Sequence, residues 1–339
     1  MVPEEWPIAA EPADHPVDPV RVRGPSRLST VRRDFFLDPS DRLTEQERAL
    51  MTAMLHDLIA SLSAQIHAAA GNRAGDPQPA KIAERLGIAG LIDRSGLVSL
   101  MLRRSDEHRI ATAFASHAGP RKLPLLPRLV GDSDPRVAAA AMALVLARGR
   151  RRDGFGQPRI ELSDLHPADA SAIVSSVAAA LSPDRRQDIR FATAASTVAG
   201  AIDADESLDK AVAGLIDALE AAGRSDEDVL EEASGEGEVA LIAQLIGRKA
   251  GIGPQAAWDH LVNAGEGGLA LLARMAGLGR KVAARLIADL GSTIGATSVE
   301  EEIARYDSLG DEEVAAQRSH WELPREYRFA RVALGEPRG

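Results

Sequence analysis

The sequence predicts an all-α protein. Of its 339 residues 45% are hydrophobic but only 3% are aromatic, so alanine and leucine supply most of the apolar surface. Alanine and leucine are strong helix formers, whereas strands favour β-branched and aromatic residues. Apolar residues also recur every three or four positions, which is the period of a helix. We expect an N-terminal helical bundle followed by a HEAT-like α-solenoid of stacked helical pairs.

Residues 1–40 are expected to form a disordered or loosely docked arm. Six prolines fall before position 30, and no helical periodicity runs through the segment. Acidic, proline-rich sequence of this kind buries too little apolar surface to fold by itself.

Residues 41–105 are predicted to form the helical bundle. Thr44 and Glu47 have the spacing of a capping box, which marks a helix start. Two further helical segments are expected, over 81–86 and about 96–102. The apolar face of the first helix consists of Met51, Met54, Leu55, Leu58, Leu62 and Ile66.

Residues 106–330 are predicted to form the HEAT-like repeat domain, with residues 331–339 as a tail. A capping residue precedes proline at Asp134-Pro135, Ser182-Pro183 and Gly253-Pro254. Proline is favoured at the first position of a helix, where its missing N–H has no partner to lose. Each pair therefore predicts a helix start, and Gly310-Asp311 predicts the start of a last helix.

The most specific local pattern is LLPRLVGDSDPRVA, from Leu125 to Ala138. One helix ends, a short turn follows, and Asp134 caps an alanine-rich second helix whose buried face starts at Val137. This order is typical of a HEAT-type repeat. Because one helical pair cannot bury its own apolar side, neighbouring pairs are expected to stack into a continuous core.

Four stretches carry a resemblance to known proteins: LTEQERALMTAMLHDLI, GDSDPRVAAAAMALVLA, VALIAQLIGRKAGIGPQAAWDHLVNAGEGGLALLARMAGL and RYDSLGDEEVAAQRSHWELPREYR. With them, residues from about 40 to 330 resemble a family of uncharacterised bacterial all-helical proteins with HEAT-like repeats. The resemblance implies the helical fold. It implies no activity, because these motifs describe packing rather than chemistry.

Several classes of protein are excluded by simple absences. The chain has no cysteine, which excludes disulfides and thiolate zinc sites and fits a reducing compartment. It has no run of 18 or more apolar residues, so no transmembrane helix is expected. Its acidic, proline-rich start is the opposite of a secretory signal peptide. We therefore expect a cytoplasmic protein with no membrane partner.

The net charge of −10 works against nucleic acid as a partner. The charge is concentrated in residues 201–237, the acidic segment, which holds twelve acidic and two basic residues. The rest of the chain is close to neutral, so it can still form local basic patches.

One such patch consists of Arg148, Arg150, Arg151 and Arg152, which we call the arginine cluster. It follows a predicted helix and precedes a turn, 153–156, that is expected to be flexible. Cations near a helix C-terminus are stabilising by up to about 1 kcal/mol each, and this effect alone explains why arginines occur there. Alternatively, they bind an acidic partner or a phosphate, and the acidic segment is a candidate mate in the same or another molecule.

Two glycine turns have the outline of a DNA-binding helix-hairpin-helix: Gly251-Ile252-Gly253 and Gly277-Leu278-Gly279. Glycine N–H groups at a helix start can bind a phosphate, and Arg280 and Lys281 add positive charge. Alanine replaces the usual proline before both turns, however, and His260 stands where an apolar residue is expected. Glycine is also an ordinary helix C-cap, so stacked repeats explain the same pattern.

His56 is a candidate phosphoacceptor. It begins His56-Asp57-Leu58, the core of a histidine-kinase or phosphotransfer box, and it groups on the helical wheel with Thr52 and Ser63, which predicts a solvent-facing imidazole. No ATP-binding motif follows it. A phosphotransfer or kinase-mimicking element is therefore an alternative function, beside an ordinary exposed histidine.

No catalytic, metal or cofactor motif is present. The eight histidines lack ligand spacing, and His108 lies in the stretch 103–109, interpreted as a mixed-charge helix surface. We therefore expect a non-enzymatic helical scaffold that binds another protein, in bacterial signalling or regulation, with a homodimer through the N-terminal helices as one arrangement. The alternatives are the His56 element and a nucleic-acid-binding repeat protein that uses the glycine turns.

Overall fold

A computed structural model describes residues 43–71, 78–116, 123–224, 226–263, 267–294 and 298–324, with isolated positions after 326. The predicted arm, residues 1–40, lies outside the described residues, as does most of the predicted tail, 331–339.

The described residues form an all-α fold, which confirms the predicted class. Apart from one isolated bridge between Arg152 and Pro158, their regular structure is helical. The helices are α2 (Glu45–Ala69), α3 (Pro79–Ile88), α4 (Ser95–Ser116), α5 (Leu125–Val130), α6 (Pro135–Arg150), η3 (Leu162–Asp164), α7 (Pro167–Leu181), α8 (Asp188–Gly200), η4 (Ala204–Glu206), α9 (Leu208–Ala221), α10 (Asp226–Glu236), α11 (Val239–Ala250), α12 (Pro254–Trp258), the π-helical η5 (Asp259–Asn263), α13 (Gly268–Met275), α14 (Arg280–Ile294), α15 (Val299–Ser308) and α16 (Asp311–Glu322).

Most predicted helix starts are confirmed. Thr44 and Glu47 form the reciprocal capping box of α2. Asp134 accepts the N–H of Arg136 with proline next to it in α6, and Gly253 precedes Pro254 in α12. The prediction at Ser182 is wrong: Ser182 ends α7, and its hydroxyl donates to Asp188, where α8 begins.

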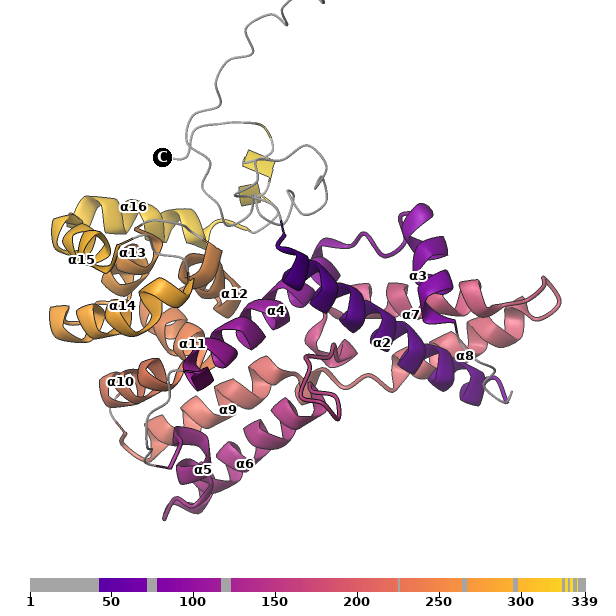
Figure 1. Ribbon diagram of the computed structural model, residues 1–339, viewed down its shortest axis with the longest axis horizontal. Coiled ribbons are helices and arrows are strands. Elements are labelled where there is room, and N and C mark those ends of the chain that lie inside the picture. Colours follow the sequence, from indigo (N-terminus) through magenta and orange to yellow (C-terminus); the bar gives the residue numbers. More distant parts are fainter. Residues whose placement is uncertain are drawn as a thin grey trace, which may run out of the picture.

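Two separate clusters of buried apolar residues form the interior. The N-terminal core joins α2, α3 and the first half of α4 to α7 and α8. The C-terminal core contains Ile110 of α4, then α5, α6 and residues of α9 to α16. Figure 1 shows the two groups of helices side by side. The return of α7 and α8 to the N-terminal core was not expected, because the sequence assigned everything after residue 106 to the repeat array.

Helix α2 is the one described helix long and apolar enough to cross a membrane. Its buried residues include Met54, Leu58 and Ile66, and it contacts α3, α4, α7 and α8. A core helix of a soluble protein has the same length and composition. In this fold α2 is the central helix of the N-terminal core.

Helix α4 belongs to both cores. Leu97 and Met101 pack into the N-terminal core, whereas Ile110 packs into the C-terminal core. Figure 1 shows α4 running between the two groups of helices. Its middle turns therefore lie where the cores meet, and the polar residues there form the site described next.

Candidate functional site

The middle of α4 is polar and buried. Arg103 is 6% exposed, Arg104 is 4% exposed, and Ser105 and Asp106 are also buried. The interpretation of residues 103–109 as a mixed-charge surface is therefore wrong for its first half. A helix that passes between two cores is covered on all sides, so side chains that would normally reach water must find partners inside the protein.

Arg103 is held by two carboxylates and an aromatic ring. It donates to both carboxylate oxygens of Asp209, at 2.6 and 3.1 Å, and to Glu107 at 3.2 Å. Its guanidinium lies 5.0 Å from the ring centre of Trp258. Burial would lower the pKa of Arg103, but the negative charges of Asp209 and Glu107 raise it above its usual value.

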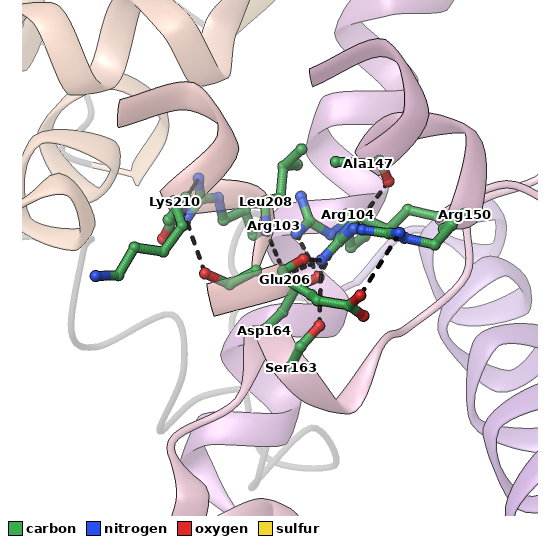
Figure 2. Close-up of polar contacts among 12 residues, drawn as sticks. Arg103, Arg104, Ala147, Arg150, Ser163, Asp164, Glu206, Leu208 and Lys210 are labelled. Carbon is green, nitrogen blue, oxygen red and sulfur yellow. Dashed lines mark hydrogen bonds and ion pairs between the residues drawn. The ribbon is translucent and has the colours of Figure 1, made fainter. Parts of the chain in front are cut away.

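Asp164 is the second centre of the network (Figure 2). Arg151 donates to both of its oxygens, at 2.7 and 2.6 Å, and Arg104 donates to one at 2.8 Å. The N–H of Leu208, the first residue of α9, donates to Asp164 at 2.8 Å. Burial alone would raise the pKa of Asp164, but the hydrogen bonds from Arg151 and the charge of Arg104 hold it below its usual value. The carboxylate therefore ties α4, α6 and α9 together.

A cleft of about 540 Å³ opens beside this network. Its walls come from the second half of α4, the end of α6, the turn at 152–158, and the junction of α10 with α11. Arg148, Arg151 and Arg152 all line it, so three members of the arginine cluster meet in one place. Arg150 points elsewhere, into a groove between α6 and α9, and lies 3.9 Å from Glu206.

The arginines in the cleft differ in how their charge is used. Arg151 is committed to Asp164, while Arg148 pairs with Glu238. Arg152 is exposed and makes no ion pair within the described residues. Partial burial and the charge of Arg152 both lower the pKa of His108, at the cleft wall, below its usual value. The acidic segment does supply a mate within the same molecule, Glu206 for Arg150.

The turn at 152–158 is fixed by its own hydrogen bonds, although the sequence predicted a flexible segment. The carboxylate of Asp153 accepts the N–H groups of Phe155 and Gln157, both at 2.8 Å. Arg159 closes the turn by donating its N–H to the carbonyl of Arg151, and its side chain binds Asp57 of α2 at 2.7 Å. Phe155 stands at the tip and is 93% exposed.

Phe155, Asp164 and Glu238 were not predicted to be site residues. The only local signal was Asp153, because aspartate often accepts the N–H two residues on and so orders a turn. The partners Asp164 and Glu238 are distant in sequence from the arginines that they bind, and no local pattern reveals them.

The two glycine turns cap helices in the same way. Gly251 and Gly277 have left-handed backbones, with φ of 73° and 65°, and their N–H groups donate to Arg248 and Arg274 carbonyls. Arg280 donates to both oxygens of Asp307, at 2.8 and 2.9 Å.

The other candidate cation at these turns, Lys281, is also paired. It lies 3.7 Å from Glu231, in a separate pocket that is also lined by Arg285. Gly279 is exposed between α13 and α14.

His56 lies on α2 and is half-buried. Its neighbour Asp57 is bound to Arg159. Ser63, predicted to share a solvent face with His56, is fully buried and donates to the carbonyl of Ile59 at 2.6 Å. That face of α2 is therefore partly covered. Among the described residues, no three histidine, aspartate or glutamate side chains are grouped as metal ligands.

A protein-family model described as "Uncharacterised protein conserved in bacteria (DUF2336)" matches residues 93–319. The chain belongs to this family. The DUF2336 region begins just before α4 and ends within α16, so it contains the buried network, the cleft and both glycine turns, whereas His56 precedes it. No curated protein matches the chain. No solved structure matches it either.

Proposed function

We propose that this protein is a non-enzymatic helical scaffold that binds another protein, and that the turn at 152–158 is the centre of the contact. The observation that carries the proposal is Phe155, an aromatic side chain that is 93% exposed on a turn fixed by hydrogen bonds.

A rigid exposed aromatic residue suits binding for a thermodynamic reason. Aromatic side chains are enriched among the few residues that carry most of an interface's binding energy. An anchor whose backbone is already ordered loses less conformational entropy on binding. Because Asp153 holds the backbone N–H groups of Phe155 and Gln157, the turn has been ordered before any partner arrives.

The helix that leads into the turn adds an apolar surface. Met142, Val145 and Leu146 of α6 are all exposed, and their spacing places them on one face of the helix. Exposed apolar side chains that gather on one face are typical of an interaction surface.

The charge around the turn indicates the chemistry of the partner. Arg152 has no ion pair within the described part of the chain, and the Arg150–Glu206 pair is solvent-exposed and long, at 3.9 Å. Pairs of that kind contribute little, so both arginines are available. The partner we propose therefore presents carboxylates around an apolar pocket. A cytoplasmic role in bacterial signalling or regulation belongs to the same proposal.

The two alternatives have less support. At the glycine turns, Arg280 donates to both oxygens of Asp307, and the N–H groups of Gly251 and Gly277 already donate to helix carbonyls. His56 is half-buried, and Asp57 beside it is engaged by Arg159.

The test begins with affinity capture on the full chain, followed by titration of each captured protein in purified form. Phe155→Ala should weaken binding at least tenfold, and Arg152→Gln should reduce both the association rate and its dependence on salt. Ile189→Ala is the matched control, because Ile189 is 82% exposed but lies on α8. Binding that Phe155→Ala leaves unchanged, or that Ile189→Ala weakens equally, would contradict the proposal.

A further inference from the structure

We propose that the cleft between α4, α6 and α11 binds a small organic anion, with its carboxylate or phosphate at Arg148 and Arg152 and a compact apolar body against Phe114. This inference concerns a ligand of the isolated chain. It does not depend on the protein partner proposed above.

The size and lining of the cleft suit such a ligand. Its volume of about 540 Å³ falls within the range of about 300 to 1,000 Å³ that is usual for small-molecule sites. One part of the wall is apolar, with Phe114, Pro124 and Pro158 among its residues. The other part is charged, with Arg104, Arg148, Arg151 and Arg152 beside Glu107, Glu236 and Glu238. Apolar walls with a few charged groups are the common composition of a ligand pocket.

The aromatic wall is held in place by Gly237. A Cβ atom on Gly237 would lie 2.6 Å from the ring of Phe114, so the backbone of Gly237 is packed directly against that ring. The φ of Gly237 is +70°, which also favours glycine. One side of the ring is therefore covered by the backbone at the junction of α10 and α11.

Positive groups converge on the cleft from three elements. Arg104 of α4 is 4% exposed, lines the cleft, and leaves its Nε without a hydrogen-bond partner. Arg148 comes from α6, and Arg152 from the turn that follows it. The third element is α11, whose first residues, Val239 and Ala240, line the cleft with no side-chain cap, although the N–H of Val239 donates to the carbonyl of Gly237. The N-terminus of a helix attracts anions through its open N–H groups.

One acidic side chain already occupies the position of an anion. Glu238 stands at the N-cap position of α11, yet its carboxylate binds Arg148 instead of capping the helix. Burial would lower the pKa of Arg148, and Glu238 outweighs this effect and raises it. An incoming anion would displace Glu238 and take over its interaction with Arg148.

This competition predicts an unusual response to mutation. Glu238→Gln removes the negative charge that competes with the ligand, so it should tighten anion binding at least threefold. Arg152→Gln should weaken the same binding at least tenfold. If the Arg148–Glu238 pair had only a structural role, Glu238→Gln would not tighten ligand binding while Arg152→Gln weakens it.

The experiment is calorimetric titration of the full chain with three probes: inorganic phosphate, phenyl phosphate and phenylacetate. The first two test phosphate, the third tests carboxylate, and the last two carry an apolar body. We expect saturable binding of at least one organic probe, tighter than that of inorganic phosphate. Arg285→Gln is the control, since Arg285 is an exposed arginine paired with Asp289 outside the cleft.

Circular dichroism confirms that each variant is folded before titration. The proposal is overturned if no organic probe binds saturably to either the wild type or Glu238→Gln at millimolar concentration. It is also overturned if Arg152→Gln and Arg285→Gln bind the probe equally well. Phe155→Ala should leave probe binding unchanged, so failure of the protein-binding proposal is distinguishable from failure of this one.

Discussion

The guanidinium of Arg151 binds both carboxylate oxygens of Asp164, at 2.6 and 2.7 Å, and neither side chain is more than 4% exposed. The two residues lie on different elements, the end of α6 and η3. The same carboxylate accepts the N–H of Leu208 at the start of α9. The pair therefore helps to hold α6 and α9, both of which contribute residues to the cleft, against α4.

Asp164→Ala should lower the free energy of unfolding by about 3 to 5 kcal/mol, because it leaves two buried arginines without their shared carboxylate. Chemical denaturation with urea measures the loss. Asp307→Ala is the comparison, since Asp307 also receives a two-pronged arginine but on the surface. Its cost should be much smaller, because ion pairs in contact with solvent contribute little to stability. Equal costs would mean that the burial of the Arg151–Asp164 pair has no energetic effect.

His260 should make the protein less stable in acid. Burial, and to a lesser extent the charges of His320 and Arg328, lower the pKa of His260 from 6.5 to about 4. As pH falls, the histidine of the unfolded chain is protonated near pH 6.5, before His260 of the folded protein is. The folded protein therefore has the full stability contributed by neutral His260 only above pH 6.5. This stability is lost as pH falls toward 4, by up to about 3 kcal/mol.

Urea titrations at several pH values measure how the free energy of unfolding changes with pH. In His260→Phe the slope of this dependence should be smaller between pH 6.5 and 4. Phenylalanine keeps the ring contact with Trp321, whose centre lies 4.8 Å from that of His260. It also removes two buried ring nitrogens that have no hydrogen-bond partner. An unchanged slope in the variant would show that other groups cause the acid sensitivity.

Gly237→Ala should be more destabilising than Gly251→Ala. Both glycines have left-handed backbones, with φ of 70° and 73°, so alanine costs about 1 kcal/mol at either position from conformation alone. At Gly251 the added methyl group meets open space, whereas at Gly237 it meets the ring of Phe114. We expect a further 1 to 3 kcal/mol there, about the cost of overpacking. Phe114→Leu in the same chain should recover part of it.

Asp153→Ala should loosen the turn at 152–158 without unfolding the protein. The backbone N–H groups of Phe155 and Gln157 lose their shared acceptor, so their hydrogen exchange should become faster by at least tenfold. Exchange in α6 should stay the same, because the turn lies beyond the end of that helix. If the N–H of Phe155 exchanges as fast in the wild type as in Asp153→Ala, the turn is not ordered in solution. Phe155 is then not a rigid anchor for a partner.

The parts of the fold that sequence reasoning predicted are local. Thr44 with Glu47, and Asp134 with Pro135, mark helix starts through contacts within four residues, so the sequence alone contains the cause. The arginine cluster was also identified locally, as adjacent cations.

The parts that were missed depend on contacts between distant segments. A charged stretch such as 103–106 is ordinarily exposed, and only the arrangement of two cores around α4 buries it. Ser182-Pro183 matched a helix start, but Ser182 ends α7 and its hydroxyl donates to the carboxylate of Asp188, six residues further on. Likewise, nothing near Arg148 in sequence indicates that Glu238 is its partner.

The shared helix α4 also decides how the chain can be divided. Neither core is a contiguous stretch of sequence, since the N-terminal core needs α7 and α8, and the C-terminal core needs the second half of α4. A single cut of the gene at any point between α4 and α9 therefore leaves both products with exposed apolar surface. A shorter version of this protein that folds alone must be built by deletion and rejoining, with α4 kept whole.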